Sequence, residues 1–324
     1  MARAASYPIS DHCDGRRFFN PRGHINRTWG DVMRWRRTSR PTAWPANIDF
    51  SPPPLAPHPG GTVVDCTTIN HATFLLRWAD LTILTDPVYS PCAGPLGRLG
   101  PRRVHAPGIA WADLPRIDLV LLSHDHYDHC DLPTLRALAR RDTPLAITPL
   151  GNGPLLRRAG FAAARIVELD WWQPHRTTQG AAVTLTPARH WSNRLSGARN
   201  GRLWGGFHLA HGDRRIVFTG DTGYDDTFFR EIGHRLGAPD LALIPIGAYE
   251  PRWFMAPQHC NPAEAVRIYQ DLGARRGLGM HWGTFQLTDE GREAPLSALA
   301  AAHAAAGISE AEFSAPAPGV TVQI

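Results

Sequence analysis

The sequence predicts a layered α/β domain in which helices lie outside two packed sheets. Short β-rich segments alternate with segments of helical spacing from residue 62 onward, and they fall into two halves of similar order. The segment 117–123 (IDLVLLS) is an almost continuous apolar run, which suits a strand that is buried on both faces. With 324 residues, of which 43% are hydrophobic, the chain is long enough to form the core of such a domain.

The elements can be assigned in chain order from their apolar periodicity. The segment 131–141 has helical spacing, with Asp131 at the expected N-cap position. The expected strands of the first half are 62–66, 73–78, 81–85, 117–123 and 144–148. The second half is expected to contain strands at 182–188, 205–211, 214–220 and 240–246, a Gly-rich strand that leads into Met280, and helices near 226–236, 262–273 and 295–307.

Residues 1–60 differ in composition from the rest of the chain. They combine Arg and Trp with a proline cluster at 51–59, and proline does not fit a helix interior or an inner strand. We therefore expect an N-terminal extension, residues 1–60, that wraps a single domain formed by residues 61–324.

Cysteine usage indicates a reducing compartment, and hydropathy predicts neither a signal peptide nor a membrane span. The five cysteines are widely spaced and contain no CxxC pair, so neither a disulfide framework nor a zinc ribbon is expected. The first twenty residues lack the apolar segment of a signal peptide, and no run of 18 apolar residues occurs. We expect a cytoplasmic protein, with peripheral contact at the inner membrane surface left open.

The charge of the chain is moderately positive, with a formal net charge of +5, and all 34 basic residues other than histidine are arginine. A coding bias explains this usage better than nucleic-acid binding, because there is no arginine-rich tail and no basic stripe with interleaved aromatic residues. Nucleic acid is therefore not an expected partner. The charge is compatible with attraction to anionic lipids or phosphate esters.

The segment HDHYDH at 124–129 carries the strongest indication of chemistry. It directly follows the buried strand 117–123 and precedes the expected helix. Three imidazoles and a carboxylate on one short loop suit a zinc ion, whereas packing gives a loop no reason to hold this set. We therefore interpret four side chains of this loop as metal ligands: His124, His126, Asp128 and His129.

Three further candidate ligands stand where an expected strand passes into a loop. They are His190 after 182–188, Asp221 in the sequence TGDTG, and His281 after Met280. Alone, each is more typical of a cap, a core histidine or a turn. Together they would allow one edge of the two sheets to collect seven ligands.

The HxHxDH motif resembles that of the metallo-β-lactamase-fold hydrolases, and the resemblance covers roughly residues 60–310. His190, Asp221 and His281 fall in the chain order of the later ligands of that family. The resemblance implies a four-layer αββα sandwich with two divalent metal ions, usually zinc, at one edge of the sheets. It also implies one metal ion on His124, His126 and His190, a second on Asp128, His129 and His281, and Asp221 as the bridge between them.

The chain resembles one branch of these hydrolases more closely, the N-acyl-phosphatidylethanolamine-hydrolysing phospholipase D family. The most specific part is the string IPIGAYEPRWFM at 244–255, which separates this branch from ordinary β-lactamases, glyoxalases and RNA-processing nucleases. The other segments that carry the resemblance are SHDHYDH (123–129), ELDWW (168–172), GDTGY (220–224) and HWGTF (281–285).

This resemblance implies a zinc-dependent phosphodiesterase that splits an N-acyl-phosphatidylethanolamine into an N-acylethanolamine and phosphatidic acid. Two metal ions about 3.5–4 Å apart suit this chemistry, because they can hold a hydroxide at neutral pH and clamp the phosphate oxygens. The alternative is a soluble hydrolase of the same fold that acts on a lactone or a small phosphate ester. A third interpretation is a metal-binding or nucleic-acid-binding protein without turnover. The expected partner is a phospholipid or phosphodiester, and the resemblance is compatible with a homodimer.

Several residues have two open interpretations. His259 aligns with a histidine of the family and either contacts the phosphate or protonates the leaving group, or it is a loop residue beside an N-cap at Asn261. Tyr127 either donates to a phosphate oxygen or only packs. His71 and Asp86 either orient the ligands from outside the coordination sphere, or are a core histidine and a turn cap.

The aromatic strings are equally open. Trp171 and Trp172, and the segment 252–255 with Trp253, either line an acyl-chain groove or a membrane interface, or lie in the core. Cys130 is expected to be a small buried residue rather than a ligand.

Overall fold

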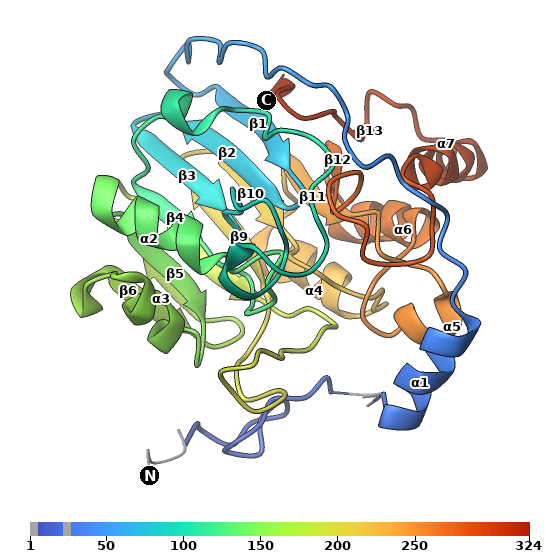
Figure 1. The fold of residues 1–324 in the computed structure, drawn as a ribbon. Helices are drawn as coiled ribbons and strands as arrows, with labels where there is room; N and C mark the ends of the chain where they lie inside the picture. Colours follow the sequence, from blue (N-terminus) through green and yellow to red (C-terminus); the bar gives the residue numbers. More distant parts are fainter. Residues whose placement is uncertain (1–5, 22–26) are drawn as a thin grey trace.

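The computed structural model describes residues 6–21 and 27–324, and it confirms the predicted layers. Two seven-stranded sheets face each other, with helices on both outer faces (Figure 1). In spatial order the first sheet contains β14 (Thr321–Gln323), β1 (Val64–Asn70), β2 (Thr73–Trp78), β3 (Leu81–Thr85), β4 (Leu119–Leu121), β5 (Leu145–Pro149) and β6 (Ile166–Leu169). The second contains β13 (Phe313–Ser314), β12 (Gly277–Met280), β11 (Leu241–Pro245), β10 (Arg214–Phe218), β9 (Gly206–His211), β8 (Ala182–Thr186) and β7 (Pro174–Arg176).

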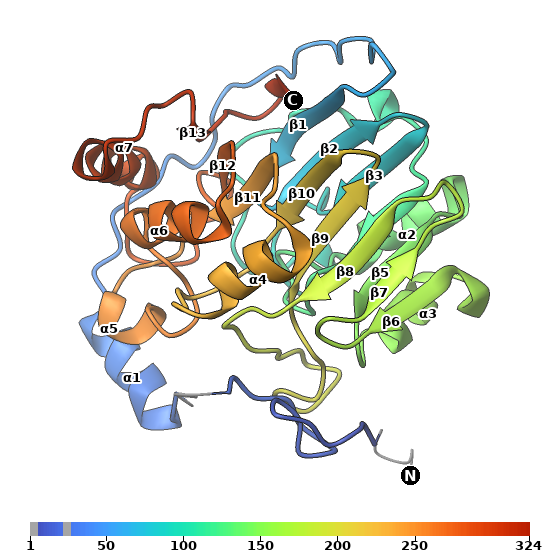
Figure 2. The ribbon, with the colours of Figure 1, turned by 180° about the vertical axis from the view of Figure 1, so that it is seen from behind.

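The helices divide between the two sheets, as the view from behind also shows (Figure 2). The α-helices are α1 (Trp29–Thr38), α2 (Leu132–Arg141), α3 (Gly153–Ala159), α4 (Phe228–Leu236), α5 (Arg252–Met255), α6 (Pro262–Leu272) and α7 (Ala294–Ala306). Short 3-10 turns form at η1 (Pro95–Gly97), η2 (Trp111–Asp113) and η3 (Ala163–Arg165). Helices α2 and α3 pack on the first sheet, and α4, α6 and α7 pack on the second.

Strand β4 shows why the segment 117–123 is apolar almost throughout. Leu119 and Leu121 belong to the core between the two sheets, whereas Val120 and Leu122 belong to the core under α2 and α3. Successive residues of a strand point to opposite faces, so a strand covered on both faces needs apolar residues at every position. This strand ends directly before the HDHYDH loop.

Most expected elements are observed within a few residues of their predicted bounds, and β2 and β3 have the bounds that the sequence predicts. Asp131 stands at the N-cap position of α2, but its side chain makes no capping hydrogen bond to the helix backbone. Its carboxylate instead accepts hydrogen bonds from Ser90 and from the hydroxyl of Thr134. It therefore fixes the loop that contains Ser90 against the start of α2.

The N-terminal extension runs along one side of the molecule from α1 toward β1 (Figure 1). Its backbone contacts the domain at Thr42, which donates to the carbonyl of Asp289, and at Ile48, which donates to the carbonyl of Val104. The proline cluster forms neither helix nor strand, as expected. Of the expected extension, residues 1–5 and 22–26 lie outside the described part.

Helix α1 is an element of the extension that the sequence did not predict. A capping box between Thr28 and Asp31 starts it, and its Trp35 stacks on Phe254 of α5 with the ring centroids 5.1 Å apart. None of its residues is fully buried. The contact with α5 therefore places α1 beside the functional site, although α1 has no core face of its own.

Candidate metal centre

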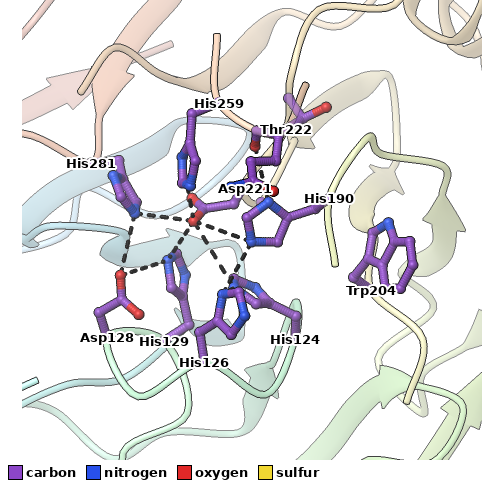
Figure 3. Close-up of polar contacts among 12 residues, drawn as sticks. His124, His126, Asp128, His129, His190, Trp204, Asp221, Thr222, His259 and His281 are labelled. Carbon is purple, nitrogen blue, oxygen red and sulfur yellow. Dashed lines mark hydrogen bonds and ion pairs between the residues drawn. The ribbon is translucent and has the colours of Figure 1, made fainter. Parts of the chain in front are cut away.

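The seven predicted ligands lie together at one edge of the two sheets (Figure 3). The HDHYDH loop follows β4 of the first sheet, Asp221 lies beyond the end of β10, and His281 directly follows β12 of the second sheet. Because β10, β11 and β12 are parallel, their carboxyl ends meet at the same edge. His190 reaches the same place from the loop after β8.

A first group of ligand atoms consists of three imidazole nitrogens. His126 Nδ1 lies 3.0 Å from His124 Nε2 and 3.1 Å from His190 Nε2. Three nitrogens at this spacing could hold one ion, because each would reach about 2.0–2.1 Å toward a zinc ion between them.

A second group is built around Asp128. Its Oδ2 lies 3.6 Å from His129 Nε2, 3.4 Å from His281 Nε2 and 3.1 Å from His71 Nε2. All four side chains offer atoms within 4.8 Å of one another. This group could hold a second ion, either with His71 as a ligand or with His71 as the hydrogen-bond donor that orients Asp128.

Asp221 lies between the two groups. Its Oδ2 is 3.1 Å from His129 Nε2 and 3.1 Å from His281 Nε2, and it is 3.7 Å from His190 Nε2. The same oxygen is 3.9 Å from His124 Nε2. A single carboxylate that faces both groups is the arrangement that a bridging ligand requires.

Outer partners hold three of the histidines in one tautomer. His129 Nδ1 donates to Asp86 Oδ2 at 2.6 Å, and His190 Nδ1 donates to the carbonyl of Gln258 at 2.9 Å. The hydroxyl of Ser123 donates to Asp86, so it accepts from His124 Nδ1 at 2.9 Å. In each ring the Nδ1 proton has its own acceptor, and Nε2 is left as the ligand atom.

The backbone at the cluster is strained at several places. His71, Asp86 and His281 have positive φ angles of 40°, 30° and 62°. Gly220 also has a positive φ, of 59°, and a Cβ there would lie 2.9 Å from the Cβ of Ser123. Gly220 adopts this conformation without strain, whereas residues with a side chain that are held in this region cost about 1–3 kcal/mol each and concentrate at functional sites. The structure therefore keeps an unfavourable backbone where the cluster is built.

Burial and the two carboxylates set the protonation of the cluster. Burial lowers the pKa of His190 to about 3 and that of His126 to about 4, so both rings are neutral at pH 7 and each has a nitrogen lone pair for a metal ion. Burial also opposes the charged form of His281, but Asp221 and Asp128 outweigh it and raise its pKa to about 9. The carboxylates therefore attract positive charge to the centre of the cluster.

These residues fit a pair of metal ions. Among the described residues, His129 Nε2, His281 Nε2 and Asp221 Oδ1 are buried and have no hydrogen-bond partner. Neutral imidazole nitrogens and carboxylate oxygens are the donors that zinc and similar divalent ions take in proteins. The cluster is therefore consistent with a binuclear metal site.

A cavity of about 310 Å³ lies beside the cluster. His126, Asp128, Asp221 and His259 form its metal side. The other described lining residues are Arg27, Val32, Trp35, Trp191, Arg199, Ala248, Phe254, Met255, Gln258, Leu287 and Thr288. Most of these are apolar, and three of them come from the N-terminal extension.

His259 and Tyr127, which were predicted to act in catalysis, occupy different positions. His259 lines the cavity, and its Nδ1 lies 4.0 Å from Asp221 Oδ2. Asn261 is the N-cap of α6, as one interpretation of this loop expects, while a contact of His259 with the substrate stays a prediction. Tyr127 is not among the described lining residues, and the guanidinium of Arg194 covers its ring at 4.0 Å.

The structure also places the other residues for which the sequence allowed two interpretations. His71 and Asp86 both contact predicted ligands, and Cys130 is buried outside the ligand groups of the described chain. Trp171 is a core residue whose Nε1 donates to the carbonyl of Trp204, while Phe254 and Met255 line the cavity. Part of the segment 252–255 therefore lines a cavity, whereas Trp171 belongs to the core, and an acyl-chain groove at 252–255 stays a prediction.

Sequence reasoning missed most of the cavity wall. Trp35 comes from α1, Trp191 and Arg199 come from the loop between β8 and β9, and no motif marks them. The position of Trp191 directly after His190 was the one available indication. Its ring packs against His126 with the centroids 4.6 Å apart.

A two-sheet fold with a buried His/Asp cluster at the strand ends defines a metal-dependent hydrolase of the metallo-β-lactamase type. Residues 81–282 match the family model for the beta-lactamase superfamily domain, which is more than half of the chain. The chain therefore belongs to the metallo-β-lactamase superfamily.

Comparisons with individual proteins are more specific. The chain is 38% identical over 228 residues to an N-acyl-phosphatidylethanolamine-hydrolyzing phospholipase D of Caenorhabditis elegans, a match that covers 68% of this chain and 64% of the relative. It is 41% identical over 235 residues to an uncharacterised protein of Mycobacterium tuberculosis, with 72% of this chain and 62% of the relative covered. The match thus spans less than two thirds of the length of either relative.

The solved structures support the fold. An isothiocyanate hydrolase from Delia radicum gut bacteria has a TM-score of 0.63 and 23% identity, over 80% of this chain and 98% of that chain. At this identity the likeness concerns the fold alone.

Proposed function

We propose that the chain is a zinc-dependent phosphodiesterase of phospholipase D type, which cleaves N-acyl-phosphatidylethanolamine to N-acylethanolamine and phosphatidic acid. The observation that carries the proposal is the cavity, in which apolar walls and two arginines adjoin the metal cluster. An acyl chain suits the walls, and a phosphodiester suits the cluster and Arg199. The activity that the nematode relative is named for supports the same substrate class.

The proposed metal ligands follow from the two groups of atoms. His124, His126 and His190 would hold one ion, Asp128, His129 and His281 the other, and Asp221 would contact both. When bound, two such ions activate water and neutralise the charge of a phosphoryl group. Asp86 and Ser123 position the histidines, and His71 positions Asp128.

His259 is proposed to contact the substrate. Burial lowers its pKa to about 3, so the ring is neutral at pH 7. A neutral imidazole suits a hydrogen bond to a phosphoryl oxygen better than protonation of the leaving group. Tyr127 is left out of the proposed catalytic set, because Arg194 stacks on its ring away from the lining residues.

Contact with a cytoplasmic membrane surface is part of the proposal. Trp29 of α1 is 75% exposed, and Arg36 and Arg37 on the same helix are exposed. An exposed helix with arginines and a tryptophan suits an anionic lipid surface, and α1 lines the cavity through Val32 and Trp35. No helix in the described part of the chain has the length and apolar character needed to cross a bilayer. The homodimer stays a prediction.

The test is mass spectrometry of the products after the zinc-loaded protein meets vesicles that contain N-acyl-phosphatidylethanolamine. We expect N-acylethanolamine and phosphatidic acid from the wild type and neither product from Asp221→Ala. A wild-type protein with two bound metal ions and no product would contradict the proposal. Lactones and small phosphate esters would then be the substrates to test.

A further inference from the structure

Three buried N–H groups in the cavity wall lack a hydrogen-bond acceptor among the described residues. They are Trp35 Nε1, Trp191 Nε1 and Arg199 Nε. Buried polar groups in proteins are satisfied in the great majority of cases. Three unsatisfied donors around one cavity therefore indicate a ligand that brings acceptor atoms.

Arg199 is held in place without being neutralised. Its guanidinium donates to the carbonyl of Arg27 at 3.2 Å and lies 4.7 Å from the centre of the Trp191 ring. Burial lowers the pKa of this guanidinium, and no carboxylate in the described part of the chain offsets the effect. The Trp191 ring packs in turn against His126. The Trp191 ring thus lies between the guanidinium of Arg199 and His126 of the first ligand group.

Arg27, the other arginine of the cavity, has a different role. Its Nε donates to the carbonyl of Phe254 at 3.0 Å, and its terminal nitrogen donates to the carbonyl of Trp253. These bonds tie the N-terminal extension to α5, and they explain Arg27 without a ligand. Arg199 also donates to a carbonyl, that of Arg27, but its Nε has no partner among the described residues.

The charge of the lining residues indicates which acceptor fits. The carboxylates among the described lining residues are Asp128 and Asp221, and both face the metal cluster. The rest of the wall offers donors and apolar surface. A neutral ester would leave the charge of the half-buried Arg199 without a partner, whereas an anionic oxygen would pair with it.

We propose that Arg199 and Trp191 form a subsite that binds an anionic phosphoryl oxygen of the substrate, and that Trp35 of α1 completes it. The inference rests on the proposed function and deepens it, because the subsite selects charged esters with an apolar chain over neutral esters and lactones. Arg199 is then a specificity-determining residue. The N-terminal extension, which lies outside the family match at 81–282, contributes to specificity through Trp35.

Kinetics of the zinc-loaded full chain on two soluble substrates test the subsite. The anionic diester is bis(4-nitrophenyl) phosphate, and the neutral ester is 4-nitrophenyl butyrate. We expect Arg199→Met to raise KM for the diester about tenfold to a hundredfold, the effect of one lost hydrogen bond to a charged group. KM for the neutral ester should change less than about threefold. Arg199→Lys should recover part of the loss, because it keeps the charge without the planar fork.

A matched control is available in Arg235, whose guanidinium lies 4.5 Å from the ring centre of Trp172 outside the cavity. Arg235→Met removes the same kind of arginine–tryptophan contact and should leave both KM values unchanged. The metal content of each variant is measured alongside, and Arg199→Met should keep two ions per chain.

The outcomes separate the subsite from the proposed function. If the wild type cleaves the diester and Arg199→Met has the wild-type KM, the subsite is wrong and the function stands. If the wild type cleaves no phosphodiester, the function fails, and calorimetry with inorganic phosphate then decides the subsite. Phosphate binding weakened at least tenfold by Arg199→Met would support it, and unchanged binding would overturn it.

Discussion

Replacing Asp86 by Asn tests how the metal cluster is positioned. The Oδ2 of Asp86 accepts from His129 Nδ1 at 2.6 Å and from the Ser123 hydroxyl at 2.5 Å, while Oδ1 accepts from the Ser123 backbone at 2.7 Å. An amide has one oxygen, so its NH₂ group must face a donor in either orientation. Losing one hydrogen bond to a buried charged group costs about 1.5–3 kcal/mol of unfolding free energy. Losing an outer partner of a metal ligand lowers metal affinity about ten- to hundredfold.

The assay compares two quantities, metal affinity by competition with a chromogenic chelator and unfolding of the metal-free protein in urea. Asp142→Asn is the matched control, because Asp142 is a buried carboxylate that accepts from the backbone of Ile117 and from Arg141, away from the cluster. It should lose stability and keep metal affinity. The reasoning is refuted if Asp86→Asn binds both ions as tightly as the wild type.

Three further predictions concern the cluster, the N-terminal extension and α1. Asp221→Ala should lower turnover more than about a hundredfold and lose bound metal with unchanged circular dichroism, since even an outer partner contributes ten- to hundredfold; full activity with two ions would contradict the bridge. Burial opposes protonation of His12, but Asp170 and a neighbouring carboxylate outweigh it and raise its pKa. The protonated ring of His12 therefore stabilises the fold fully below about pH 6.5, and this stabilisation is lost as the pH rises through the raised pKa. In urea titrations, the free energy of unfolding should fall less between pH 6 and pH 9 for His12→Gln than for the wild type. Trp29→Ser should weaken binding to anionic vesicles about tenfold, whereas Val320→Ser, which also changes an exposed apolar residue, should not; equal effects would contradict contact at α1.

The strands of the core could be predicted because their pattern is local. The runs at 73–78 and 81–85 and the turn between them are adjacent in the sequence, and their observed bounds agree. Strand β14 could not be predicted, because its three residues become a strand only by pairing with β1. Helix α1 escaped prediction for a related reason, since its place depends on α5 rather than on a buried face of its own.

The predicted ligands were identifiable because their chemistry is concentrated at strand ends. The structure brings all seven side chains together, although which of them bind an ion stays a prediction. The residues that line the cavity could not be predicted in the same way. Trp35 belongs to α1, whereas Trp191 and Arg199 belong to the loop between β8 and β9, and only the fold places these two segments around one cavity. His71 and Asp86 had two interpretations each, and their hydrogen bonds to Asp128 and His129 favour the positioning role.

The division of the cluster between the two halves of the chain has a consequence for synthesis on the ribosome. The HDHYDH loop emerges well before Asp221 and His281, so a nascent chain that ends after β6 offers only part of the donor set. The edge of the first sheet at β1 also stays open until residues 321–323 emerge and pair with it (Figure 2). Partial donor sets bind metal weakly, because a site forms with its fold. Tight uptake of both ions is therefore expected to be a late event, after most of the polypeptide has been translated.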